Sequence, residues 1–282
     1  MTHSTALAAE RKDSAGTPAA DTALEASRAT ARRHLAAAHR LAVWHDLTEG
    51  IYNHFTVAVP GTDDRFHVPP FGLHWSEVKA SELLTVHHDG RVLDGEGILQ
   101  RSAYSIHAPI HASSPAHAAV LHTHMPYASA LVRLEDQRLQ PLGQTEALLL
   151  DQIAYDDSYD GLARDWAEGE RLARVLGNKS ILFMGNHGIL VTGRSVAQAY
   201  DRLYSLERYA RVHLHALWTG RPVKNLSPEQ VAKVQYQIGN TALHDGQASA
   251  AKPAYELHFD ALLRLLDRKA VSYTHLTLPT NR

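Results

Sequence analysis

Short apolar runs alternate along the sequence with longer stretches in which apolar residues recur every three or four positions. The longer stretches have the periodicity of amphipathic helices. The first is an amphipathic stretch whose apolar positions include Leu35, Leu41 and Trp44. The sequence therefore predicts helices over residues 29–47, 104–112, 160–177, 195–220 and 227–243.

Polar residues at the ends of these stretches support the helix boundaries. Ser195 followed by Gln198 has the spacing of a capping box, and Ser227-Pro228 places a capping residue before a proline at the first helical position. Gly177 is a typical stop signal. We expect three well-bounded helices in the second half of the sequence.

The short apolar runs predict strands. "NHFTVAVPGTDDRFHVP" indicates strand, turn and strand, and "LLTVHHDGRVL" indicates a hairpin around Asp89-Gly90. "AAVLHTH" indicates a buried strand, and "SILFMGNHGILVTG" indicates two strands joined at Asn186 to Gly188. The expected fold is α/β: one domain over residues 30–245, with a central, mostly antiparallel sheet flanked by helices.

The two ends of the sequence differ from this domain. Residues 1–25 are rich in Ala, Ser, Thr and Asp without an apolar face, which predicts a disordered leader. Residues 246–270 are interpreted as a C-terminal helical extension. Residues 271–282, "VSYTHLTLPTNR", do not continue that helical pattern and resemble a translated sequencing adapter. We interpret them as a non-native tail and give them no weight in the fold.

Composition narrows the chemistry. The net charge of −2 indicates no field that would draw the protein to nucleic acid or to an anionic membrane. No apolar run is long enough to cross a membrane, and no signal peptide is evident, so a cytoplasmic location is expected. Cysteine is absent, whereas there are 20 histidines, so a metal site would use imidazole and carboxylate ligands.

His122 and His124 lie two apart on a predicted strand, so their side chains point to the same face and can reach one metal ion. His187 lies between two apolar runs in "GNHGI", where the neighbouring glycines would let it approach another strand. Other pairs are less suited to a metal: His87-His88 point to opposite faces, and His213 and His215 do not face each other on a helix. His107 and His111 share a helical face, and metal binding, support of a ligand and plain packing remain open for them.

These motifs form a known combination. "HAPIHASSPAHAAVLHTHMPYASAL", then "FMGNHGILVTGRSVAQAY" and a helix with "LERYAR", closely resemble the class II aldolase/adducin family from about Ala36 to Trp218. The resemblance implies a single α/β domain and a divalent metal, usually zinc, held by His122, His124 and His187. The metal would act as a Lewis acid on a small-molecule carbonyl substrate. It also implies a homotetramer with active sites between subunits.

The sequence departs from the sugar-phosphate aldolases of this family at their catalytic glutamate. That residue precedes the first metal histidine by nineteen positions, and here the position is Ala103. Alanine cannot accept a proton, so another base would be needed. Candidate catalytic residues are Glu146 and Tyr127, and His107 could orient a metal ligand through a hydrogen bond.

A second departure concerns phosphate binding. Phe71 stands where a phosphate-binding serine is expected, and Asn53-His54 replaces Gly-Asn. Only Ser102 remains of the serine pair that precedes the glutamate position. We expect Phe71, Ser102, Ala103 and Asn53 to line the substrate pocket. We expect the apolar ring to favour a non-phosphorylated compound, such as an aromatic one.

Three functions are compatible with these sequence features. The preferred one is a metal-dependent lyase that cleaves a carbon–carbon bond by a retro-aldol reaction or a decarboxylation. Three histidines without a carboxylate would also suit a non-heme Fe(II) oxygenase, and Mn(II) is a further candidate ion. The third is a non-catalytic, adducin-like assembly module. Tyrosines at 200, 204 and 209 on one predicted helix suggest either a subunit interface or packing within the subunit.

Overall fold

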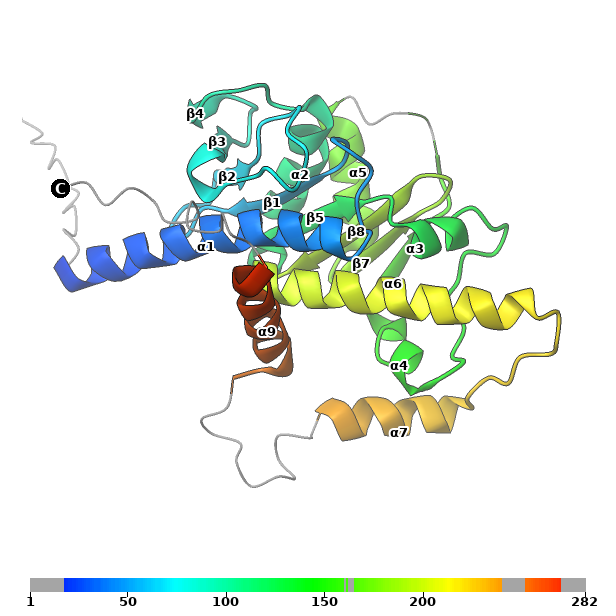
Figure 1. Cartoon of the computed structure of the whole chain (residues 1–282). Helices are drawn as coiled ribbons and strands as arrows, with labels where there is room; N and C mark the ends of the chain where they lie inside the picture. The colour runs from blue at the N-terminus through cyan, green and yellow to red at the C-terminus, as the bar shows by residue number, and fades with distance from the viewer. Residues whose placement is uncertain (1–17, 160, 162–164, 240–251, 270–282) are drawn as a thin grey trace, which may run out of the picture.

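One eight-stranded sheet forms the centre of the protein, with the strand order β4-β3-β2-β1-β5-β8-β7-β6 (Figure 1). The computed structural model describes residues 18–159, 161, 165–239 and 252–269. Neighbouring strands are antiparallel except β6 and β7, which are parallel. The strands are β1 (His54–Ala58), β2 (Arg65–Val68), β3 (Leu84–His87), β4 (Val92–Asp94), β5 (Ala119–Thr123), β6 (Ile153–Asp156), β7 (Ile181–Met184) and β8 (Gly188–Gly193).

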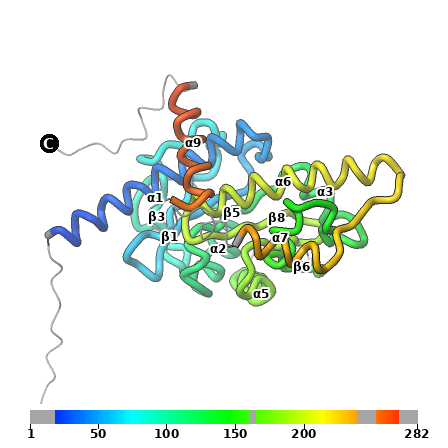
Figure 2. Tube along the Cα trace, turned by 90° about the horizontal axis from the view of Figure 1, so that it is seen from below, coloured from blue at the N-terminus to red at the C-terminus, as the bar shows by residue number. Residues whose placement is uncertain are grey.

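Helices cover both faces of the sheet (Figure 2). On one face lie α1 (Pro18–Trp44), α6 (Val196–Trp218) and α9 (Ala254–Lys269), and on the other lie α2 (Arg101–Ser113) and α5 (Trp166–Leu176). The remaining helical elements are α3 (Pro126–Leu131), α4 (Gln144–Ala147), α7 (Pro228–Gly239) and 3-10 turns at Ala80–Glu82, Pro115–His117 and Leu150–Gln152.

Alternation along β5 divides the core between these two layers. Leu121 packs with α1 and α6 in the larger cluster, whereas Val120 packs with α2 and α5 in a second cluster. His122 has the same parity as Val120 and faces the α2 side. The expected α/β fold with a mostly antiparallel sheet is confirmed.

Most predicted elements are present at the predicted places. Both hairpins form, and Ser195 Oγ accepts a hydrogen bond from the Gln198 N–H at the start of α6. The helix expected from residue 160 instead begins at Trp166, because the carboxylate of Asp165 caps it by accepting from the Glu168 N–H. Strand β6 was not predicted; it is an edge strand of only four residues without a clear alternation.

The predicted disordered leader is wrong for residues 18–25, which form the first turns of α1. The alanine-rich sequence favours a helix, and tertiary contacts hold it: Leu24 packs on Gly61, and Arg28 Nε donates to the Pro60 carbonyl at 3.1 Å. Residues 1–17 lie outside the described residues, as does the whole of the 271–282 tail.

The predicted C-terminal extension contains a helix, α9, that packs on α1 and α6. Phe259, Leu262 and Leu266 are buried in the larger core cluster, so the packed unit extends beyond residue 245 to the end of α9. Within the described ranges, no helix is both long and apolar enough to span a membrane.

Candidate metal centre

Three histidines converge at one end of β5 and β8. One ring nitrogen from each of His122, His124 and His187 lies within 4.8 Å of the other two. The ring centroids are 4.9 to 5.1 Å apart. The structure therefore brings together the three histidines that the sequence selected as metal ligands.

Local backbone features explain why these rings can meet. His122 is the fourth residue of β5 and pairs with Leu190 of β8, while His124 follows the end of the strand. His187 lies in the turn before β8, where Asn186 adopts a left-handed conformation with φ 57°. A Cβ on Gly188 would lie 2.4 Å from the ring of His124, so only glycine allows the ring to settle there.

Hydrogen bonds orient two of the rings. His122 Nδ1 lies 2.9 Å from the Ile189 carbonyl, and His124 Nδ1 lies 2.7 Å from the Glu49 carboxylate. Both partners are acceptors, so each Nδ1 carries the proton and each Nε2 keeps its lone pair. Nε2 of His124 is buried and has no hydrogen-bond partner. Such an atom fits a metal ligand supported from behind by a carboxylate.

Burial favours the neutral form of His122 and His187. Burial first, and the neighbouring histidines next, lower the pKa of His122 well below its usual value. The same two causes lower the pKa of His187 to about 4. Neutral imidazoles are the form that binds metals, so the donor set fits one divalent ion such as Zn(II), Fe(II) or Mn(II).

The histidines open onto a cavity of about 550 Å³. Its wall combines the β1 entry, the start of α2 and the segment after β6. Tyr159, 50% exposed, lines this wall, and its ring centroid lies 6.2 Å from that of His187. The full lining is Glu49, Tyr52, Asn53, His54, Gln100, Arg101, Ser102, Ile106, His122, His124, Tyr159, Gly161 and His187.

Two of the four predicted pocket residues lie on this wall. Ser102 lies at the start of α2 and shares its pocket face with Ile106, one turn on. Asn53 adopts φ 68°, a left-handed conformation that glycine and asparagine tolerate best, and its amide donates to Glu49 at 3.3 Å. Asn53 thus supports the carboxylate that orients His124.

The other two predicted pocket residues are displaced from it. Ala103 is fully buried in a separate cluster with Phe66 and Leu84, because the first turn of α2 directs it toward β2 and β3. Phe71 is held in a β-bridge to Ile98, and its ring centroid lies 6.3 Å from that of Tyr52, which lines the cavity. The structure therefore does not bring either side chain to the wall of this pocket.

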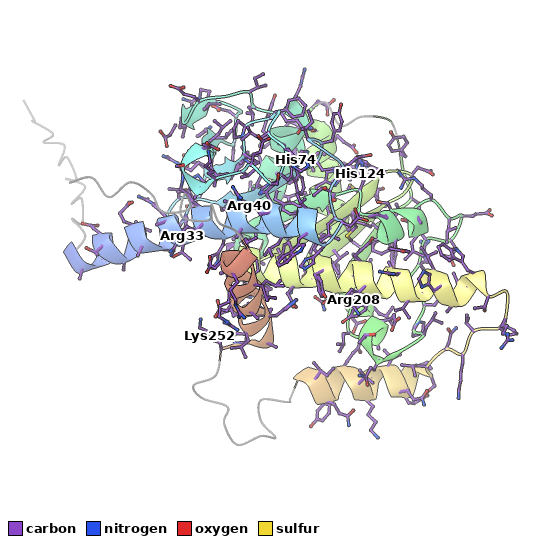
Figure 3. All side chains as sticks on the ribbon, viewed as in Figure 1. Arg33, Arg40, His74, His124, Arg208 and Lys252 are labelled. Carbon is purple, nitrogen blue, oxygen red and sulfur yellow. The ribbon has the colours of Figure 1, made fainter. Side chains whose placement is uncertain are left out.

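Neither predicted catalytic residue lines the pocket in this protomer. Glu146 is 2% exposed on α4, where Thr145 Oγ1 donates to it at 3.0 Å and its charge acts on His213 of α6. In Figures 1 and 3, α4 lies below α6 while His124 lies above it. The short helix turns the carboxylate inward, away from the three histidines.

Tyr127 is directed elsewhere as well. It lies in the first turn of α3, where its N–H donates to Glu207 at 2.8 Å. Its ring packs near His215 and Arg211, beside a different cavity. The carboxylate of Glu207 caps α3 and fixes this orientation.

His107 supports the site indirectly. Its Nε2 lies 2.9 Å from Nδ1 of His54, which is paired with His122 across β1 and β5. The His54 and His122 ring centroids are 5.2 Å apart. The predicted role as an orienting residue therefore reaches the metal ligands only through His54.

Sequence reasoning missed Glu49, His54 and Tyr159. The alternation in β1 could have found His54, because positions 54 and 56 share a face opposite to Phe55. Glu49 and Tyr159 lie in irregular segments, and no periodic signal marks them.

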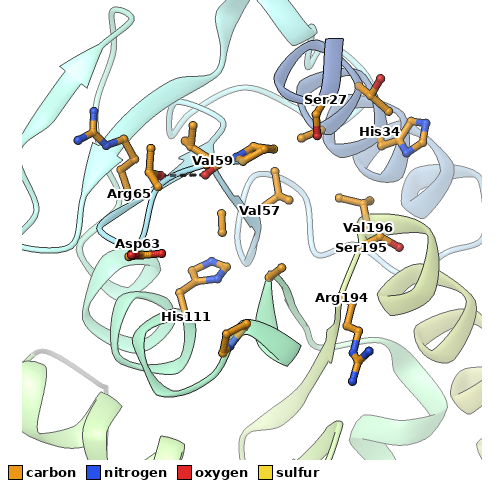
Figure 4. Close-up of a pocket in the computed structure, with 18 of the residues that line it drawn as sticks. Ser27, His34, Val57, Val59, Asp63, Arg65, His111, Arg194, Ser195 and Val196 are labelled. Atoms are coloured by element: carbon orange, nitrogen blue, oxygen red, sulfur yellow. Dashed lines mark hydrogen bonds between the residues drawn. The ribbon is translucent and has the colours of Figure 1, made fainter. Parts of the chain in front are cut away.

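A larger cavity of about 580 Å³ lies at the opposite end of β1 and β5, near Val57, Ala118 and Arg194 (Figure 4). None of the three converging histidines lines it. Size alone therefore does not identify the candidate site.

A family model and a solved structure that match this chain both belong to the class II aldolases. The model of the Class II Aldolase and Adducin N-terminal domain matches residues 33–214. An aldolase II superfamily protein from Pseudomonas syringae has a solved structure that is 34% identical, with a TM-score of 0.78 over 87% of this chain and 95% of that chain.

The chain is also similar to an aldolase of known structure and to an adducin. L-fuculose 1-phosphate aldolase from Glaciozyma antarctica is 24% identical, with a TM-score of 0.72 over 87% of this chain and 93% of that chain, which shows the fold alone. Alpha-adducin of Rattus norvegicus is 31% identical over 243 residues, which are 84% of this chain and 33% of that protein.

Proposed function

The protein belongs to the class II aldolase and adducin family, and on that premise we propose that it is a metal-dependent lyase. It would cleave a carbon–carbon bond, by retro-aldol reaction or decarboxylation, in a small non-phosphorylated hydroxy or oxo compound. The observation that carries the proposal is the convergence of His122, His124 and His187, with Nε2 of His124 buried and unpartnered. Zinc is the expected ion, with Fe(II) and Mn(II) as alternatives.

A bound divalent ion would supply Lewis-acid polarisation of a substrate carbonyl. The protein's own residues would do the rest. Glu49 and the Ile189 carbonyl hold His124 and His122 in the required tautomers. Arg101, exposed at the start of α2, offers the pocket a guanidinium that suits a substrate carboxylate.

The proton transfer needs a residue other than those predicted from sequence. Among the described residues that line the pocket, Glu49 is the one carboxylate, and it is engaged by His124. Tyr159 lines the same wall, and its hydroxyl is not hydrogen-bonded to one of the three histidines. We therefore propose that its phenol moves the proton. Its position beside His187 supports this assignment.

We also propose that the protein assembles as a homotetramer. Family resemblance favours a homotetramer, and exposed Val212, Trp218 and Tyr236 support an interface along α6 and α7. The tyrosines taken from the sequence give no such support. Tyr200 is fully buried and bonds His45, and Tyr204 packs on His258 of α9, so this face of α6 packs within its own protomer.

The similarity to alpha-adducin favours a second candidate, a non-catalytic assembly module. Ala103 at the family's glutamate position agrees with that alternative, whereas retention of three converging histidines favours the lyase. Metal content separates the two candidates, because an assembly module has no use for the ion.

The test is metal analysis of protein purified without added metal, with zinc and iron measured separately, followed by turnover of simple hydroxy-ketones and hydroxy-acids with and without oxygen. The lyase predicts about one divalent ion per chain and cleavage that needs no oxygen. Strict dependence on iron and oxygen would replace the lyase by an Fe(II) oxygenase. A metal-free protein that gains no ion on addition would favour the assembly module. Tyr159→Phe should reduce turnover without reducing metal content.

A further inference from the structure

A buried hydrogen-bond chain runs from the pocket wall along β1, and the proposed lyase role does not account for it. The contacts connect alternating side chains of β1 with one face of α2. In order, they are Ser102 Oγ to His54 Nε2 at 3.1 Å, His54 Nδ1 to His107 Nε2 at 2.9 Å, His107 Nδ1 to Thr56 Oγ1 at 2.8 Å, Thr56 Oγ1 to His111 Nε2 at 2.8 Å, and His111 Nδ1 to the His117 carbonyl at 2.8 Å.

The three imidazoles of this chain are neutral. All three rings are buried, and their hydrogen-bond partners within the chain are hydroxyls, a backbone carbonyl and other imidazoles, with no carboxylate that would favour a charged ring. A neutral imidazole has one N–H donor and one acceptor nitrogen. Each ring must therefore donate at one end and accept at the other.

The backbone carbonyl at the far end fixes the direction. A carbonyl only accepts, so His111 donates from Nδ1, and its Nε2 must accept. Thr56 has one hydroxyl proton, and the His111 Nε2 lone pair requires it at 2.8 Å; the Val120 carbonyl lies farther off at 3.4 Å. Having given its proton to His111, Thr56 Oγ1 can only accept from Nδ1 of His107.

The same reasoning carries the direction back to the pocket. His107 donates from Nδ1, so its Nε2 accepts the proton of His54 Nδ1. His54 Nε2 is then an acceptor, and the Ser102 hydroxyl must donate to it at 3.1 Å. The one proton of Ser102 is committed to the interior, and only oxygen lone pairs remain for the cavity.

We propose that Ser102 Oγ faces the pocket as a hydrogen-bond acceptor, so the pocket takes a ligand that presents a free hydroxyl or a protonated amine at this point. This rests on the proposed function insofar as it treats the cavity beside the histidines as the substrate site. It names a substrate class: a compound with an unmodified hydroxyl beyond the pair of oxygens that a metal would chelate. A phosphate ester oxygen, which only accepts at neutral pH, would meet an acceptor.

A proton conduit is the competing use of such a chain. His111 does line the larger cavity at the other end of β1, as do Asp63 and Arg65 (Figure 4). Its Nδ1 proton, however, ends on a backbone carbonyl, which cannot pass a proton on. The chain therefore sets a direction rather than connecting the two cavities, and Thr56, His54, His107 and His111 are positioning residues.

Thr56→Val gives the sharpest test because it removes the hydroxyl in the middle of the chain. Through that hydroxyl, the His117 carbonyl determines whether Ser102 donates to His54 or accepts from it. Without the Thr56 oxygen, a donor at His107 Nδ1 would be buried without an acceptor. His107 avoids that by carrying its proton on Nε2, which then donates to His54. His54 would in turn donate from Nε2 to Ser102, whose own proton becomes free for the pocket. Thr56→Ser keeps the oxygen and is the matched control.

The first measurement is the tautomer of each histidine, by long-range ¹H–¹⁵N NMR on metal-free protein labelled with ¹⁵N-histidine. The expected result is a proton on Nδ1 of His54, His107 and His111 in the native protein and in Thr56→Ser. A proton on Nε2 of His54 or His107 in the native protein would overturn the proposal. Because metal and ligand are absent, failure of the lyase proposal leaves this result unaffected.

The second measurement is calorimetric binding of dihydroxyacetone and of dihydroxyacetone phosphate to zinc-loaded protein. Loss of one neutral hydrogen bond in Ser102→Ala should weaken dihydroxyacetone about five- to tenfold and leave the phosphate ester unchanged. Thr56→Val should shift the preference toward the phosphate ester, and Thr56→Ser should not. Weaker binding of the phosphate ester to Ser102→Ala would show that Ser102 donates, and would overturn the proposal.

Discussion

Two groups of three histidines lie side by side on the α2 face of the sheet. They differ in whether their ring nitrogens have hydrogen-bond partners. In the buried hydrogen-bond chain, both nitrogens of His54, His107 and His111 have a partner within 3.1 Å. In the converging group, Nδ1 of His122 and of His124 is bonded, while Nε2 of His124 is buried without a partner.

Convergence, rather than an unpartnered nitrogen alone, distinguishes a candidate ligand from a structural histidine. A buried polar atom without a partner costs about 1–3 kcal/mol. His39 also keeps such a nitrogen, but its ring lies against Phe55 and Trp75, whereas His124 belongs to a group whose ring nitrogens lie within 4.8 Å of one another. A metal ion would compensate at His124. In the buried hydrogen-bond chain the ring nitrogens satisfy one another and their neighbouring hydroxyls and carbonyl, so no ion is needed. Its residues are nevertheless also histidines, and the ring of His54 contacts that of His122 in the converging group.

The largest expected effect comes from removing one converging histidine. His187→Ala takes away one of three ligands and should weaken zinc binding by at least about a hundredfold, since loss of a supporting residue alone costs up to that amount. Competition with a chromophoric chelator measures the affinity. His74→Gln changes an exposed turn histidine and serves as the control. Equal zinc affinities of the two variants would show that His187 is not a metal ligand.

A smaller effect on zinc affinity is expected from a residue that supports a ligand without binding the metal. Glu49 orients His124, and Glu49→Gln would replace the charged acceptor by a neutral amide oxygen. Zinc affinity should fall about 10- to 100-fold, with little change in the urea midpoint of the metal-free protein because the Glu49 side chain is 55% exposed. Glu82→Gln, which alters a surface pair with Lys79, should leave both quantities unchanged. An unaltered zinc affinity in Glu49→Gln would show that the carboxylate does not support the ligand.

The sequence predicted the converging group better than the residues around it. Two positions apart on a strand is a local rule, and it placed His122 and His124 together; the glycines beside His187 indicated the close approach, which Gly188 provides. The helices and hairpins followed from equally local patterns. The family motif then related His187 to the other two across more than sixty positions.

The surroundings depended on contacts that no local pattern encodes. Ala103 was expected to face the pocket from its position relative to His122, but the start of α2 turns it toward Phe66. Glu146 and Tyr127 were chosen for their chemistry, and capping and packing around α6 direct both elsewhere. The hydrogen-bond direction at Ser102 depends on a carbonyl at residue 117, which only the folded arrangement reveals.

The effect of pH is expected in the metal-free protein itself, and it separates burial from metal binding. His111 and the fully buried His39 have pKa values lowered by burial to about 3 and about 4, below the value near 6.5 expected in the unfolded protein. Below pH 6.5 the unfolded state binds protons that the folded state excludes. The free energy of unfolding of metal-free protein should therefore be greatest above about pH 6.5 and fall as the pH approaches 4.

His39 offers a clean way to measure one such contribution, since it lies outside both histidine groups. Its Nδ1 bonds the Leu35 carbonyl at 2.8 Å, while its Nε2 is buried against Phe55 and Trp75 without a hydrogen-bond partner. His39→Leu removes one group that must be discharged on folding. Between pH 6 and 4 the slope of unfolding free energy against pH should become shallower by up to one proton, about 1.4 kcal/mol per pH unit. Urea titrations at each pH give that slope, and zinc affinity at pH 7 should not change. An unchanged slope would mean that the His39 imidazole is protonated in the folded protein, contrary to the burial that sets its pKa.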